Sequence, residues 1–284
     1  MAGAPQRGIE TRSESARAAQ AAVDWAAAEG WNPGLDDAER FLAADPDSFL
    51  ATEREGEIAA TVSCALYGGS YAFIGFYIVR SDLRRRGIGS PLFERALGRA
   101  GGRVVGLDGV LDQQLSYERR GFVLAHRNAR WRTMGGGERP TGVVELSSVP
   151  FDRLLAFDSA VFGSGRERFL RTWIDRPAGH ALACVHGDKL AGYGVLRPSH
   201  VGAKIGPLFA DGRDVADALL TGLLAAAGPR TEVFIDMPAA NRRAAELRAR
   251  RAMEPSFETV RMYLNGRPPE DVARVFGVTT FEFG

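Results

Sequence analysis

A run of three arginines followed by two glycines is the segment whose residues could do chemistry most directly. Arg84-Arg85-Arg86-Gly87-Ile88-Gly89-Ser90 follows an apolar, strand-like segment and opens a helix-like one. A loop at the start of a helix presents free backbone N–H groups and the positive end of the helix dipole, and glycine allows a ligand to approach closely. The segment therefore predicts a diphosphate cradle. A solvated basic turn is the alternative.

Two other phosphate-binding loops do not fit the surrounding sequence. The glycines are not followed by Lys and then Ser or Thr, as a P-loop requires. A dinucleotide-binding loop would follow the first strand of a parallel βαβ unit, whereas this loop follows several consecutive strand patterns joined by short turns. The order favours a mixed sheet with its anion site in the middle of the domain.

Three further side chains could act on protons near such a cradle. Tyr117 lies nine residues after Asp108, and a phenol can hydrogen-bond and donate a proton. The alternative is a tyrosine packed on the sheet. Glu29, beside a Trp-Asn turn, and Asp108, at a strand end, are candidates for a base. Their structural alternatives are a surface charge and a cap. No metal is expected, because no metal-ligand spacing occurs among His126, His180, His186 and His200.

The elements that must position these residues can be read from hydrophobic periodicity and turn residues. In the first half, helices are expected at residues 15–30, 36–44, 91–100 and 112–120. Strands are expected at residues 8–12, 49–53, 58–66, 71–79, 103–107 and 122–132. A Gly-rich stretch at 135–142 then reads as a linker.

The second half of the chain repeats the first. Gly56, Ile74 and Arg130 recur as Gly187, Ile205 and Arg261, each 131 positions later, in the same order of strand and helix patterns. A chain of 284 residues is also long enough for two domains of about 150 residues. We therefore expect a duplicated α/β domain, with a first domain at 1–134 and a second at 143–284.

Composition and charge exclude several classes of protein. Hydrophobic residues make up 45% and charged residues 25%, which is typical of globular proteins, and the net charge of +1 provides no field that would gather nucleic acid or an anionic membrane. The longest apolar run, at 218–228, is too short to cross a membrane. Cys64 and Cys184 have no CxxC partner. A cytoplasmic protein without nucleic-acid or membrane partners, monomeric or homodimeric, is expected.

The order of elements and the Arg-x-x-Gly-x-Gly motif resemble the GNAT superfamily of acyl-CoA-dependent N-acyltransferases. Arg84, Gly87 and Gly89 satisfy its signature, although Ser81 stands where many members carry proline. Segments 28–34, 73–75 and 106–110 resemble two-domain bacterial members, and 203–211 and 260–263 resemble their diverged second domain. The resemblance covers nearly the whole chain. It implies an α/β (α+β) fold of two tandem domains, each with a mixed, mostly antiparallel central sheet flanked by helices.

The resemblance also implies a function and the roles of the site residues. Acetyl-CoA would be the acyl donor, with its pyrophosphate held from Arg84 to Ser90 and its pantetheine arm along Ile78 and Val79. Tyr117 would be the general acid. The acceptor would be a primary amine of a small or amino-acid-like molecule, attacking directly in a ternary complex. A non-catalytic acyl-CoA-binding or regulatory module is the alternative.

The second domain lacks these features. At the 131-residue offset, Arg84 corresponds to Val215 and Gly89 to Leu220, and Tyr117 has no counterpart. We therefore expect a second domain that does not bind acyl-CoA but walls off the acceptor site or supplies a dimer surface. Residues 276–283 alternate like a strand, and we expect them to complete a sheet.

Overall fold

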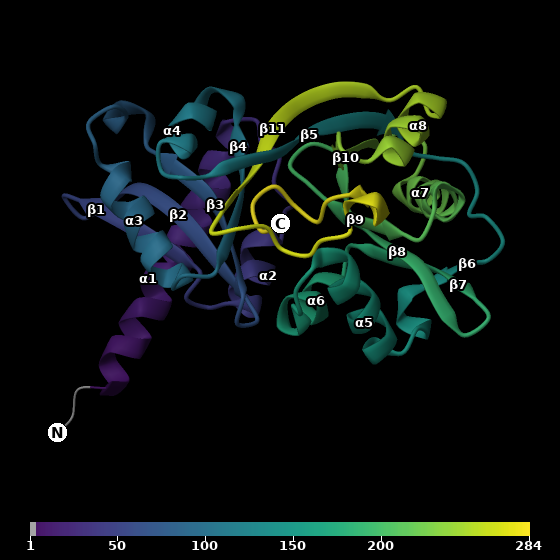
Figure 1. The fold of residues 1–284 in the computed structure, drawn as a ribbon, viewed down its shortest axis with the longest axis horizontal. Helices are drawn as coiled ribbons and strands as arrows, with labels where there is room; N and C mark the ends of the chain where they lie inside the picture. Colours follow the sequence, from purple (N-terminus) through teal and green to yellow (C-terminus); the bar gives the residue numbers. More distant parts are fainter. Residues whose placement is uncertain (1–3) are drawn as a thin grey trace.

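The computed structural model describes residues 4–284, and side chains from residue 14 onward (Figure 1). The first half contains α1 (Ala4–Ala28), α2 (Asp37–Ala44), β1 (Phe49–Arg54), β2 (Glu57–Tyr67), β3 (Tyr71–Val79), α3 (Gly89–Ala100), β4 (Val104–Val110), α4 (Gln114–Glu118) and β5 (Val123–Met134). The second half contains β6 (Val143–Glu145), α5 (Phe151–Phe162), α6 (Glu167–Ile174), β7 (His180–His186), β8 (Lys189–Pro198), β9 (Ala203–Ala210), α7 (Arg213–Ala227), β10 (Glu232–Pro238), α8 (Arg242–Arg250), β11 (Glu254–Leu264) and β12 (Val275–Gly277). None of the described helices is long and apolar enough to cross a membrane.

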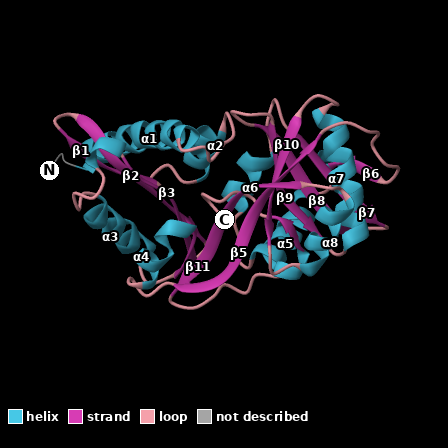
Figure 2. Cartoon of the chain, turned by 90° about the horizontal axis from the view of Figure 1, so that it is seen from above, coloured by secondary structure: helices cyan, strands magenta, loops and turns pink. Residues whose placement is uncertain are grey.

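The strands of the described chain form one 12-stranded sheet. Its order is β1-β2-β3-β4-β11-β5-β10-β9-β8-β7-β6, and β12 pairs with β9. Two of these pairings are parallel, β3 with β4 and β9 with β10. In the first half, α1 and α2 lie on one side of the strands and α3 and α4 on the other (Figure 2). The expected mixed, mostly antiparallel sheet flanked by helices is confirmed.

The two halves exchange their last long strands. β11, from the second half, lies between β4 and β5, and β5 lies between β11 and β10. The positions expected to separate the domains, at 134 and 143, do coincide with the end of β5 and the start of β6. Because each half is completed by a strand of the other, neither of these segments is a separate structural unit.

Two equivalent ion pairs secure the exchanged strands. On β5, Arg130 donates two hydrogen bonds to Asp236 of β10, at 2.7 and 2.9 Å. On β11, Arg261 donates two to Asp108 of β4, at 2.9 and 2.6 Å. All four residues are buried or lie at the cavity described below. Each carboxylate accepts two charge-assisted hydrogen bonds from one guanidinium group. The internal duplication therefore reappears as two equivalent Arg–Asp contacts, each of which joins one half to the other.

Two sequence-based predictions of secondary structure are wrong. Residues 8–12 belong to α1 rather than to a strand. Ile9 and Thr11 alternate with polar residues, but this pattern is short. The helix that the following sequence forms extends back through it, because helix propagation adds one hydrogen bond per residue. The strand expected at 276–283 is limited to β12, Val275–Gly277. Beyond β12 the chain leaves the sheet and crosses to the first half.

The C-terminal segment, residues 275–284, fills the cleft of the second half. β12 pairs with β9 at Phe209 and Leu208, and the Val278 N–H donates to the Asp236 carbonyl of β10 at 2.8 Å. Gly206 is required here, because a Cβ at that position would lie 2.3 Å from the Thr279 carbonyl oxygen. Residues 275–279 therefore occupy the space between β9 and β10 where these parallel strands stop pairing.

The same segment ends in the aromatic core between the halves. The Phe283 ring is fully buried and stacks on Phe41 of α2, with centroids 3.8 Å apart. Phe49, Phe169 and Trp173 complete this cluster from both halves. The Tyr67 hydroxyl donates to the Phe283 carbonyl at 2.7 Å. The burial of these rings fixes the C-terminal segment against the first half.

Candidate active site

A cavity opens in the first half where β3 and β4 stop pairing. The two strands pair from Tyr71 and Val104 to Ile74 and Leu107. Beyond those residues a cavity of about 810 Å³ separates them, with Ile78 and Val79 along its β3 wall. This position is equivalent to the cleft that residues 275–279 fill in the second half.

A bulge turns the edge of β3 toward this cavity. Against β2, Gly75 pairs with Ser63 but Ile78 pairs with Thr61, so β3 has an extra residue. Phe76 adopts a φ of 46°, and its carbonyl accepts a hydrogen bond from the Thr61 hydroxyl at 3.1 Å. Bulges of this kind re-aim the backbone. The β4-facing edge of β3 can therefore pair with an extended ligand such as a pantetheine arm.

The arginine-glycine loop connects this edge to the start of α3. Gly87 has a φ of 76°, which favours glycine. A Cβ at Gly89 would lie 2.3 Å from the Tyr77 hydroxyl oxygen, so only glycine lets α3 approach β3 this closely. The N-cap residue, Ile88, provides no side-chain cap. The first amides of this 12-residue helix are thus free to bind an anion beside the cavity.

The three arginines of the loop differ in their contacts. Arg84 donates to the Val79 carbonyl at 3.0 Å and forms an ion pair with Glu29. Arg85 lines the cavity together with Arg84. Arg86 is exposed and, like Gly87, Ile88, Gly89 and Ser90, lies outside the cavity lining. The loop therefore places positive charge at the cavity mouth, while Glu29 holds Arg84 in place.

Tyr117 lines the same cavity from α4. Its ring lies over Gly109 of β4, where an added Cβ would be 2.6 Å from Cε2, and packs against Phe93 with centroids 5.8 Å apart. Burial raises the pKa of Tyr117. The phenol is consequently protonated at neutral pH and able to donate a proton.

Asp108 also lines the cavity, but its oxygens are occupied. In addition to Arg261, the Asn128 amide donates to it at 2.8 Å. Burial raises the pKa of Asp108, while Arg261 and Asn128 act in the opposite direction. Its contacts are those of a residue that joins β4 to β11.

Residues of the second half supply part of the cavity wall. Nothing in the sequence indicated that these residues would lie beside Tyr117. Phe257 and Thr259 come from β11, and Phe281 and Glu282 come from the C-terminal segment. They lie more than 130 positions from Tyr117, and only the strand exchange brings them to it. The apolar residues of segment 276–283 indicated that this segment is buried, but not which part of the protein it packs against.

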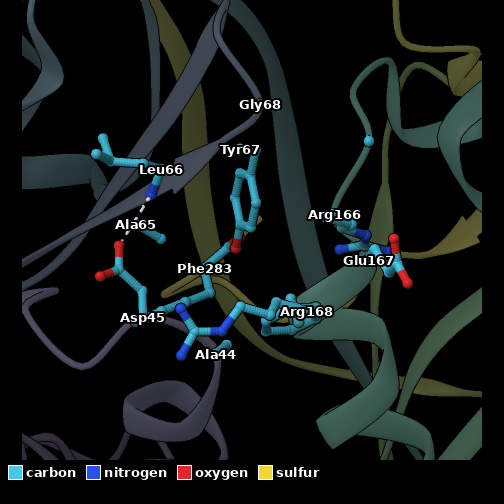
Figure 3. A pocket seen from close by; sticks show the side chains of 12 residues that line it. Ala44, Asp45, Ala65, Leu66, Tyr67, Gly68, Arg166, Glu167, Arg168 and Phe283 are labelled. Atoms are coloured by element: carbon cyan, nitrogen blue, oxygen red, sulfur yellow. Dashed lines mark hydrogen bonds between the residues drawn. The ribbon is translucent and has the colours of Figure 1, made fainter.

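A second, smaller pocket of about 190 Å³ lies between α2, the β2–β3 turn and α6 (Figure 3). Its charged groups are engaged in structural contacts. Asp45 accepts from Arg99 at 2.6 Å and from the Leu66 N–H at 3.4 Å, and Arg166 is paired with Asp158 at 2.7 Å. These contacts support the interface between the halves.

Fold and site together define an acyltransferase of the GNAT type, and comparisons with known proteins agree. The model of the acetyltransferase (GNAT) family matches residues 16–122, and that of an acetyltransferase (GNAT) domain matches residues 154–277. The chain belongs to the GNAT superfamily, with two tandem domains of that family, and is an acyltransferase.

Relatives match along most of the chain. Holothin acyltransferase from Pseudoalteromonas sp. is 30% identical over 92% of this chain and 90% of its own. A putative acetyltransferase from Pyrococcus horikoshii has a TM-score of 0.77 at 26% identity, covering 88% of this chain and 84% of that one. A tandem GNAT protein from the clavulanic acid biosynthesis pathway shares the fold, with a TM-score of 0.59 at 16% identity over 91% of this chain and 96% of that one.

Proposed function

We propose that this acyltransferase moves an acetyl group from acetyl-CoA to a primary amine of a small or amino-acid-like molecule. The observation that carries the proposal is the single cavity in which the free edge of β3, the positive charge of Arg85 and the phenol of Tyr117 meet. The edge would bind the pantetheine arm around Ile78 and Val79. An N–H of that edge would polarise the thioester carbonyl.

The remaining site residues take the following roles in this proposal. The amides from Arg85 to Ser90, with Arg85 and Arg86, hold the pyrophosphate at the start of α3. Tyr117 gives its proton to the leaving thiolate. Glu29 and Asp108 act as supports, since one is paired with Arg84 and the other with Arg261.

The second half is proposed not to bind acyl-CoA. Residues 275–279 fill its cleft, and the turn that precedes α7, Asp211-Gly212, has no arginine. Calorimetric titration with acetyl-CoA is expected to give one site per chain. Two equivalent sites would contradict this part of the proposal.

Thiol release from acetyl-CoA tests the proposed activity. The acceptor panel contains amino acids, aliphatic amines, aromatic amines and holothin, the last because of the Pseudoalteromonas relative's name. Formation of an amide from at least one amine, identified by mass spectrometry, supports the proposal. Binding of acetyl-CoA without turnover across the panel would identify a non-catalytic acyl-CoA-binding or regulatory module instead.

A matched pair of double variants tests the pyrophosphate site. Arg85→Ala with Arg86→Ala is expected to raise the Kd for acetyl-CoA by about tenfold or more, with a smaller effect at high salt. Arg242→Ala with Arg243→Ala removes two adjacent exposed arginines at the start of α8 and is expected to leave the Kd unchanged. Equal effects of the two pairs would contradict the assigned site.

A further inference from the structure

Glu282 is a buried carboxylate in the cavity of the first half, although it comes from the C-terminal segment. Glu282 is one of the residues that line the cavity, and it is 3% exposed. Its backbone lies directly on β3, because a Cβ at Gly75 would be 2.1 Å from the Glu282 carbonyl oxygen. Gly75 follows Ile74, the last residue of β3 that pairs with β4. Glu282 therefore reaches the point where the two strands separate.

One oxygen of this carboxylate has no partner within the protein. Oε1 of Glu282 is buried and makes no hydrogen bond to any described residue. Burying a polar oxygen without a hydrogen bond is costly, so such an atom calls for a partner that the described residues do not supply. The other acidic side chains of the cavity differ, because Glu29 is paired with Arg84, Asp108 is paired with Arg261, and Asp112 is exposed.

Two cationic side chains lie near Glu282 without forming an ion pair with it. Arg130 of β5 and Lys204 of β9 both interact electrostatically with Glu282, but their ion-pair contacts are with Asp236. Across the cavity lie Asp108, already paired, and Tyr117. Among the described residues, the Glu282 carboxylate thus has no hydrogen-bond or ion-pair partner that would compete with an ammonium group bound at this end of the cavity.

The backbone around Glu282 is held on both sides. The Thr280 hydroxyl accepts hydrogen bonds from the N–H groups of Glu282 and Phe283, at 2.8 and 2.9 Å. Phe281 is buried against Arg130, whose guanidinium lies 5.2 Å from the ring centroid, and Phe283 is anchored in the aromatic core. Such rigid support is what a catalytic side chain requires.

We propose that Glu282 is a catalytic residue of the acyl transfer: its carboxylate binds the ammonium group of the acceptor and removes one proton from it. The proposal rests on the proposed function. The neutral amine then attacks the thioester carbonyl, so that the C–N bond forms and the C–S bond breaks. Tyr117 protonates the sulfur and is itself reprotonated by the second proton of the attacking nitrogen. Glu282 releases the first proton to water.

The assignment also explains the division of labour between the two halves. The C-terminal segment closes the cleft of the second half with residues 275–279 and then places Glu282 in the cleft of the first. The second half consequently supplies both a wall of the acceptor site and the group that activates the acceptor. The acceptors of this enzyme would be amines that are cationic at neutral pH.

Glu282→Gln, with Glu282→Asp and Glu258→Gln for comparison, tests the role in the full-length enzyme with the best amine of the panel. Glu258 is exposed on β11 next to the cavity-lining Phe257 and Thr259, so its variant makes the same change outside the cavity. Glu282→Gln is expected to lower kcat/KM for the amine at pH 7 by about 10²–10⁴-fold, as for loss of a general base. Glu258→Gln should be unchanged, and Glu282→Asp should retain part of the rate.

The pH profile separates catalysis from a merely structural role. In Glu282→Gln, kcat/KM should rise tenfold per pH unit up to the pKa of the free amine, because only the amine that is already neutral reacts. The Kd for acetyl-CoA should remain within about twofold of the wild type, which shows that the fold and donor site persist. An unchanged rate and profile in Glu282→Gln would overturn the inference. Failure of the wild type with every amine would instead refute the proposed function.

Discussion

The ring of Phe283 should be a principal source of stability for the whole chain. It is fully buried in the core between the halves and stacks on Phe41 at 3.8 Å, with Phe49 at 5.8 Å and Phe169 at 6.4 Å between ring centroids. Phe283→Ala would remove this ring from the centre of the cluster. Because Phe283 follows Glu282 directly, the change would also loosen the segment that lines the cavity of the first half.

The expected loss in the free energy of unfolding follows from the burial of the Phe283 ring. Truncating a fully buried phenylalanine to alanine lowers the free energy of unfolding by about 3–5 kcal/mol, and less where the cavity collapses. A denaturant slope of about 3 kcal/mol/M in urea converts this into a midpoint lowered by about 1–1.7 M. Phe283→Leu keeps most of the apolar volume and should lose much less. Phe151→Ala, at a half-buried position at the start of α5, serves as the peripheral control.

Urea unfolding followed by tryptophan fluorescence and by far-UV circular dichroism measures the effect. Trp173 packs against Phe41, with centroids 5.7 Å apart, so its fluorescence reports on the cluster. The strand exchange predicts that both probes give one coincident transition. A loss below about 1 kcal/mol, or two separate transitions of which only one moves in Phe283→Ala, would refute the reasoning.

Three further predictions concern the site and the buried charges. Gly89→Ala forces α3 away from Tyr77 and should weaken acetyl-CoA binding about tenfold or more in calorimetry; unchanged affinity would contradict the close approach. Tyr117→Phe should lower kcat about 10²-fold or more with little change in acetyl-CoA affinity, and an unchanged rate at pH 7 and pH 9 would remove the general-acid role. Burial lowers the pKa of Lys204 from its usual 10.5 to about 8. The buried charge of Lys204 therefore lowers the free energy of unfolding by its full amount below pH 8. Above pH 10.5 this effect is absent, because the side chain is neutral in both the folded and the unfolded state. Lys204→Met should therefore raise the free energy of unfolding by up to about 3 kcal/mol at pH 7 and by little at pH 10.5, and a constant difference between these pH values would contradict the assigned cause.

The loop before α3 could be predicted from the sequence because its determinants are local. Gly87 lies in this loop, Gly89 is the first residue of α3, and Tyr117 lies within the same half as β3 and β4. A motif of this kind fixes backbone conformation and the start of a helix without reference to distant segments. The spacing of apolar residues likewise predicted most helices and strands, and the repeated offset of 131 positions predicted the duplication.

The part of the cavity wall that comes from the second half was decided by the tertiary structure alone. Nothing in the pattern around Arg130 or Arg261 indicates that β5 and β11 change places, because strand periodicity specifies which face is buried but not which strand is the neighbour. The same holds for Glu282, whose position near Tyr117 depends on residues 275–279 filling the other cleft. The sequence thus determined which local elements this protein has and that an arginine-glycine loop precedes α3. Packing between the halves decided which carboxylate is held free in the cavity, because long-range pairing and burial arise only when the whole chain is folded.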